Sequence, residues 1–194
     1  MTAYADLESC DYFDHGGDDP RFACEWSRSL RAVGWLGANA DFSTGILSDE
    51  VWNSLRHLVR TAWQPFYFLG SHYCGLCVRA SGGYVQDFRA TDLGKDPSRS
   101  GTFNAFIPGD GCVYVAPELI LHYITEHHYQ PPAVFCDAVL ACPPMKGAEY
   151  FKALRRNATG GFAKIIPSAP WWRFWRRSPL ANANLERDGP EQFG

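Results

Sequence analysis

The sequence predicts an α+β domain, in which a small, mostly antiparallel sheet has helices packed on it and the C-terminal half of the chain is helical. Two short apolar runs at residues 103–107 and 112–116, separated by the turn-rich sequence PGDG, are typical of a β-hairpin. Helical runs follow Pro117, and pairs of prolines separate them. Strands grouped ahead of helices favour the α+β class. With 46% hydrophobic and 15% aromatic residues, the chain of 194 residues can bury a core.

Further strands are expected ahead of the hairpin. Residues 31–36 (RAVGWL) form an apolar run that ends at a glycine, and residues 66–69 are dense in aromatic side chains. Residues 84–88 alternate like a strand. A short helix is expected at residues 21–30, before the first of these strands.

A helix is predicted over residues 49–62, because apolar side chains recur there at helical spacing. Ser48 is a good N-cap, and Asp49 and Glu50 fall in the first turn, where the helix dipole favours acidic side chains. Three more helices are expected near the C-terminal end, at residues 117–128, 133–141 and 147–157.

The composition changes near residue 159. We therefore expect a single domain over residues 1–158, followed by a Pro/Trp/Arg-rich arm and loose tail over residues 159–194. The arm contains WWRFWRR, in which Trp171, Trp172, Arg173 and Trp175 could contact a protein partner. The alternative is that these tryptophans fold back and cover the domain's own helices.

The bulk charge excludes some functions. Eighteen basic residues against 21 acidic ones give a net charge of −3, which disfavours nucleic acid and membrane as general partners. The N-terminal sequence lacks a basic start followed by an apolar run, and no apolar stretch approaches the roughly 20 residues of a spanning helix. A cytoplasmic location is expected. The seven cysteines are an odd number at irregular spacing, so a disulfide framework is not expected in such a protein.

Two short segments carry the most chemistry. GSHYCGLC holds Cys74 and Cys77, and LHYITEHHYQPP holds His122 and His127. A C-x-x-C turn brings two thiolates to one point, and a second segment then supplies the two remaining ligands of a structural zinc ion. The H-x₄-H spacing lies within the usual window for zinc ligands. We therefore expect the two segments to meet around a metal ion, most naturally zinc.

The fourth ligand is ambiguous from the sequence. Residues five apart on a regular helix lie about 140° apart around its axis. His122 and His127 can therefore face one ion only if the helix frays or tightens ahead of the Pro131–Pro132 pair. His72, in the array H-x-C-x-x-C, competes with His127 for the fourth position.

Other interpretations remain open. His127 could be a core histidine, and the two cysteines an unligated pair. A dithiol redox motif is a further alternative, although the C-G-L-C sequence follows a strand and is not expected to have the helix N-terminus that activates such thiols. A metal-dependent hydrolase would use Glu126 as general base, but H-E-x-x-H is absent, which favours a closed structural site over a catalytic one.

The elements RAVGWL, H-x-C-x-x-C and HYI-x-x-H-x-Y-x-PP resemble those of a family of small uncharacterised bacterial proteins, over roughly residues 31–154. This resemblance implies a shared fold and no established activity, and the WWRFWRR arm is not associated with that family. The sequence as a whole favours a small zinc-binding protein that acts as a non-enzymatic binding or regulatory module. The metal-dependent hydrolase and the thiol oxidoreductase are the alternatives.

Overall fold

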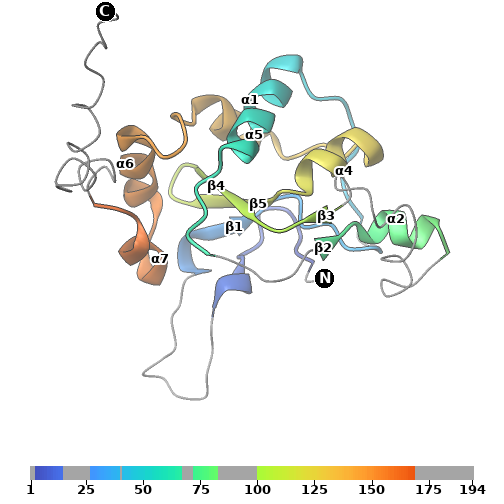
Figure 1. Ribbon diagram of the computed structural model, residues 1–194, viewed down its shortest axis with the longest axis horizontal. Coiled ribbons are helices and arrows are strands. Elements are labelled where there is room, and N and C mark those ends of the chain that lie inside the picture. Colours follow the sequence, from blue (N-terminus) through green and yellow to red (C-terminus); the bar gives the residue numbers. More distant parts are fainter. Residues whose placement is uncertain (1–2, 15–26, 40, 67–71, 83–99, 169–194) are drawn as a thin grey trace, which may run out of the picture.

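The computed structural model describes residues 3–14, 27–39, 41–66, 72–82 and 100–168, and the α+β class is confirmed (Figure 1). Its helices are α1 (Asp49–Arg60), α2 (Gly75–Ala80), α4 (Ile120–His127), α5 (Ala133–Ala141), α6 (Ala148–Asn157) and α7 (Gly160–Ile165). Its strands are β1 (Leu30–Ala32), β2 (His72–Tyr73), β3 (Ser100–Gly101), β4 (Asn104–Pro108) and β5 (Val113–Pro117), and two 3₁₀ turns lie at η1 (Asp11–Phe13) and η2 (Ser27–Ser29).

The central sheet has the strand order β1-β5-β4. Strands β4 and β5 form the expected antiparallel hairpin, with Phe106 opposite Val115. Strand β1 runs parallel to β5, so that Leu30 pairs with Val113 and the sheet is mixed. A separate antiparallel pair, β2 and β3, places His72 opposite Gly101 and leads directly into the cysteine pair.

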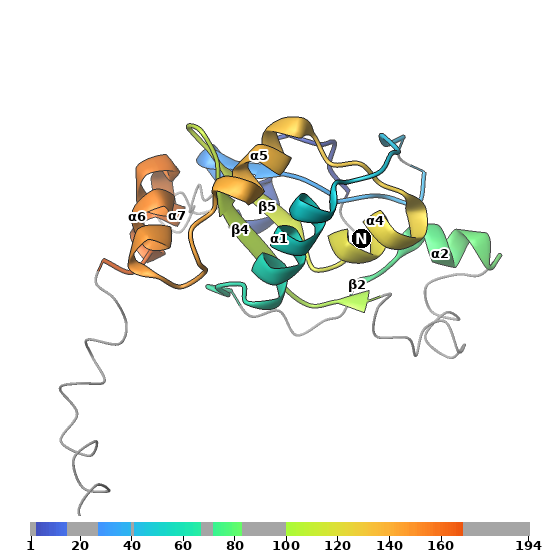
Figure 2. The same ribbon diagram turned by 90° about the horizontal axis from the view of Figure 1, so that it is seen from above.

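Both faces of the central sheet are buried, because alternate residues of a strand point to opposite sides. On β4, Ile107 faces a core that includes α1, α4 and α5, whereas Phe106 faces a second core that includes α6 and α7. Tyr114 and Val115 divide in the same way on β5. In both views α2 and α6 lie at opposite ends of the molecule (Figures 1 and 2). The cysteine and histidine segments belong to the first core.

Helix α1 begins where its sequence predicts, since the Ser48 hydroxyl oxygen accepts a hydrogen bond from the Val51 N–H at 3.3 Å. Helix α5 has the predicted bounds. The prediction of a helix at residues 21–30 is wrong at its C-terminal end, because Leu30 belongs to β1 and pairs with Val113 of β5. The strand expected at residues 84–88 and most of the one at 66–69 lie outside the described residues.

The C-terminal end of the described chain packs on the second core. Phe162 on α7 is fully buried, Ile166 is 4% exposed, and the Thr159 N–H donates to the Ser29 hydroxyl oxygen at 2.9 Å. The boundary expected after residue 158 therefore falls inside the packed part of the chain. Trp171, Trp172, Arg173 and Trp175 lie outside the described residues. No helix in the described part of the chain is both long and apolar enough to cross a bilayer.

Candidate metal centre

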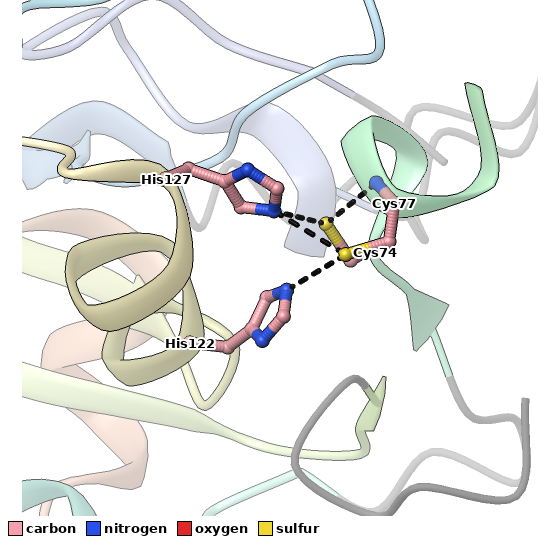
Figure 3. A group of neighbouring side chains, drawn as sticks. All are labelled: Cys74, Cys77, His122 and His127. Atoms are coloured by element: carbon pink, nitrogen blue, oxygen red, sulfur yellow. Dashed lines mark hydrogen bonds between the residues drawn. The ribbon is translucent and has the colours of Figure 1, made fainter. Parts of the chain in front are cut away.

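Four side chains from two distant segments converge on one point (Figure 3). The Sγ atoms of Cys74 and Cys77 and one ring nitrogen each of His122 and His127 all lie within 4.8 Å of one another. His122 and His127 project from α4 toward the start of α2, where the two cysteines lie. The convergence of these segments, expected from the sequence, is thus present in the structure.

The separations match those around a tetrahedral ion. Cys74 Sγ lies 3.3 Å from His127 Nε2, and Cys77 Sγ lies 3.3 Å from His122 Nε2 and 3.4 Å from His127 Nε2. A zinc ion with metal–sulfur bonds of about 2.3 Å and metal–nitrogen bonds of about 2.0 Å has S···N edges of roughly 3.6 Å. These three S···N distances are a few tenths of an ångström shorter than the edges around such an ion, so small side-chain shifts would open them to hold it.

Helix α2 presents the two thiols. Cys74 is its N-cap, and the Cys77 N–H donates to Cys74 Sγ at 3.4 Å, so that the first turn of the helix turns both sulfur atoms to one side. The expectation that this C-x-x-C pair lacks a helix N-terminus was wrong. This helix has no clear signal in the sequence, because it opens with Gly75, a poor helix former, and is only six residues long.

Helix α4 presents the two imidazoles by opening its last turn. The His128 N–H bonds to the Tyr123 carbonyl oxygen, five residues back, and the Tyr129 N–H bonds to the same oxygen at 3.0 Å. A turn closed by a bond over five residues is wider than an α-turn, so residues five apart come closer to one face. The helix thus departs from regular geometry, but it widens where tightening or fraying was expected. His128, with φ of 54°, then ends the helix in the left-handed conformation.

Residues 34–39 hold the two ligand-bearing helices in register. Gly34 contacts α4 so closely that a Cβ atom there would lie 2.9 Å from Cγ1 of Ile120. Gly75, the first residue of α2, also contacts residues 34–39, because a Cβ atom added to it would lie 3.2 Å from the Cβ of Ala38. Arg79 of α2 also donates to the Ala38 carbonyl oxygen, at 3.1 Å.

These positioning residues were not identified from the sequence. The glycines at 34 and 75 were visible in RAVGWL and CGLC, but a glycine shows only that the backbone needs freedom or close approach. Which element approaches it depends on the tertiary structure. The parallel pairing of β1 with β5, which brings residues 34–39 beside α4, joins elements over 80 residues apart and has no local signal.

The site is largely shielded from water. Cys74 is fully buried, and Cys77 and His122 are 6% and 4% exposed, whereas His127 is partly exposed. Burial raises the pKa of the Cys74 thiol to about 12, outweighing the Cys77 N–H that favours the thiolate. A cation at the centre of the four ligands would reverse this preference, because a coordinating thiol loses its proton. No disulfide joins any of the six cysteines in the described part of the chain.

Two other predicted site residues lie outside the cluster. His72 is in β2, where its Nε2 lies 3.1 Å from the Tyr12 hydroxyl, and burial lowers the pKa of its ring. Glu126 is an exposed residue of α4, one position before His127. Among the described residues, the group of potential ligands contains His127 and neither His72 nor Glu126.

The four ligands and their supporting segment define a buried Cys₂His₂ site that could bind a metal ion, in a small α+β domain. Residues 2–140 match the family described as "Domain of unknown function (DUF7919)", and the chain belongs to this family. The match includes all four ligands and residues 34–39. No curated protein and no solved structure matches the chain.

Proposed function

We propose that this protein binds one zinc ion through Cys74, Cys77, His122 and His127, and that it acts as a non-enzymatic binding or regulatory module. The observation that carries the proposal is the meeting of two cysteine and two histidine ligand atoms within 4.8 Å of one another. The ion would join α2 to α4, two elements that both contact residues 34–39.

The donor set supports zinc over other metals. Two thiolates and two imidazoles in a tetrahedral arrangement suit zinc, whereas magnesium, calcium and manganese prefer oxygen ligands. Copper(I) also accepts thiolates, and competition among metals therefore has to be measured. Zinc has no preferred geometry of its own, so the protein fixes the tetrahedron through α2 and the opened end of α4.

The closed coordination supports a structural role. A catalytic zinc ion usually has three protein ligands and a fourth position for water or substrate. Here four protein atoms lie close enough together to coordinate one ion, and three of the four side chains are buried. Glu126, the general base of the hydrolase alternative, is exposed and outside the cluster. The helix N-terminus at Cys74 favours a redox alternative, but its thiol is fully buried and would be poorly accessible to a partner disulfide.

Elemental analysis of purified full-length protein tests the proposal. We expect close to one zinc per chain in the wild type and a large loss in Cys74→Ser and in His122→Ala. Cobalt substitution should give the intense visible absorption of a tetrahedral thiolate site, and Cys74→Ser should weaken it. Cys142→Ser is the matched control, because Cys142 is a half-buried thiol outside the cluster, and it should keep the metal.

A folded wild-type protein that takes up neither zinc nor cobalt would overturn the proposal. A cobalt spectrum of a five-coordinate or water-bound ion would favour the hydrolase instead. A reversible Cys74–Cys77 disulfide in a metal-free protein at cytosolic potentials would favour the oxidoreductase.

Two parts of the proposal rest on the sequence. The partner would contact the cluster around Trp171, Trp172, Arg173 and Trp175, since arginines among tryptophans are typical of interface hot spots. The location would be cytoplasmic, because metal-binding thiols remain reduced there.

A further inference from the structure

A groove of about 530 Å³ lies between α1 and α4, beside the metal centre. One wall is a stripe of α1 at four-residue spacing, formed by Trp52, Arg56 and Arg60. The opposite wall is formed by Glu118, two residues before α4, and by His122 and Thr125 on α4. Val59, Phe103, Leu121 and Ser100 complete the lining. The volume falls within the range of small-molecule sites, roughly 300–1,000 Å³.

The lining of the groove carries two guanidiniums and one carboxylate. Arg56 and Arg60 are exposed, and neither guanidinium makes an ion pair or hydrogen bond within the described part of the chain. Glu118 is the acidic residue of the lining, and its carboxylate accepts a hydrogen bond from the Thr102 N–H at 3.1 Å instead. Two cations and one carboxylate give the lining a net positive charge, although the chain as a whole has a net charge of −3.

The groove also has the other features of a ligand site. Val59 is 1% exposed and belongs to the core, and Phe103 and Leu121 pack against that core, so the interior of the groove is apolar and firmly supported. Trp52 precedes Arg56 by one turn and is partly exposed, which leaves part of its indole available for stacking. Ligand sites combine such apolar lining with a few convergent polar groups.

We propose that this groove binds a small organic anion, whose carboxylate or phosphate pairs with Arg56 and Arg60 and whose planar ring stacks on Trp52. Two guanidiniums one turn apart can clamp a carboxylate or phosphate through several charge-assisted hydrogen bonds. Glu118 and Thr125 on the opposite wall would accept hydrogen bonds from donors on the ligand. This site is distinct from the metal centre, although His122 belongs to both.

Calorimetric titration of the full-length, metal-loaded protein tests this proposal. The probes are phenyl phosphate, benzoate, inorganic phosphate and the neutral benzyl alcohol. We expect both aromatic anions to bind, phenyl phosphate to bind more tightly than inorganic phosphate, and benzyl alcohol to bind at least about tenfold more weakly than benzoate. Binding should weaken as salt is raised, because the guanidiniums are exposed.

Three variants locate the site. The double variant R56Q/R60Q should lose about tenfold or more in affinity for the anions. Trp52→Ala should weaken phenyl phosphate more than inorganic phosphate. Arg156→Gln, which removes an exposed arginine from α6 beside a different cavity, is the matched control and should bind like the wild type.

The proposal is overturned if no aromatic anion binds the wild type, if benzyl alcohol binds as well as benzoate, or if Arg156→Gln lowers affinity as much as R56Q/R60Q. Metal content is measured in every variant. If R56Q/R60Q keeps its zinc but loses anion binding, the groove and the metal centre are separate sites. If the fully zinc-loaded wild type binds no anion, the groove proposal fails while the proposed metal centre stands.

Discussion

His127 Nε2 lies 3.3 Å from Cys74 Sγ, although 53 residues separate the two in the chain. His72, only two residues before Cys74, instead lies against Tyr12. We therefore expect His127→Ala to lower zinc affinity by about 100-fold or more, since loss of a direct ligand should exceed the effect of losing a supporting hydrogen bond. His72→Ala should keep wild-type affinity. Competition with a chromogenic zinc chelator measures both.

The opposite ranking, with His72→Ala losing zinc and His127→Ala keeping it, would show that His72 is the fourth ligand. His128→Ala is a useful control for general effects at the end of α4, because His128 adjoins His127 but is exposed and outside the cluster.

Removal of the metal should loosen α2 more than the sheet. Cys74 and Cys77 lie at the start of the short helix Gly75–Ala80, so loss of the ion would remove the coordination bonds that tie this end of α2 to α4. We expect hydrogen exchange at the amides of α2 to become at least about tenfold faster after chelation. Amides shared between β4 and β5 should change little, because their ladder lies outside the site. Equal acceleration in both regions would argue that the ion stabilises the whole fold and not this junction.

Local sequence patterns were sufficient for much of this fold. The Ser48 cap, the PGDG turn and the prolines before α5 act within a few residues, so the helix, the hairpin and the helix start that they predict are all present. The convergence of the two segments that carry the candidate ligands was also predictable, because C-x-x-C and H-x₄-H spacings constrain geometry by themselves.

What could not be predicted depends on contacts between distant segments. The parallel pairing of β1 with β5, the opened last turn of α4 and the approach of Gly34 to Ile120 all arise from tertiary packing. The choice between His72 and His127 has the same origin, since the hydroxyl of Tyr12, 60 residues away, lies within hydrogen-bond distance of His72 Nε2.

Gly34→Ala should destabilise the protein strongly. Gly34 has φ of +74°, a conformation that costs other residues about 1–2 kcal/mol. Its new Cβ would also lie 2.9 Å from Ile120, and such overpacking costs about 1–3 kcal/mol more. Gly111→Ala is the matched control, because Gly111 has φ of +65° but no atom near the new Cβ. Urea denaturation should show that Gly34→Ala lowers the free energy of unfolding by about 1–3 kcal/mol more than Gly111→Ala does. Equal losses in the two variants would show that Ile120 yields and that the contact is not tight.

Glu118→Gln should change how stability depends on pH. Burial raises the pKa of Glu118 above its usual value of 4.5, outweighing the Thr102 N–H that lowers it. The folded protein therefore holds this proton more tightly than the unfolded chain, so the carboxyl's contribution to stability is present below pH 4.5 and is lost as the pH rises through the folded pKa. Glutamine does not ionise, and the variant should become more stable relative to the wild type as the pH rises from about 4 toward 7. Urea denaturation at several pH values, in buffers without phosphate or carboxylate, measures this difference. If the wild type instead becomes more stable relative to Glu118→Gln as the pH rises, then Arg56 and Arg60 stabilise the Glu118 carboxylate across the groove more than burial destabilises it.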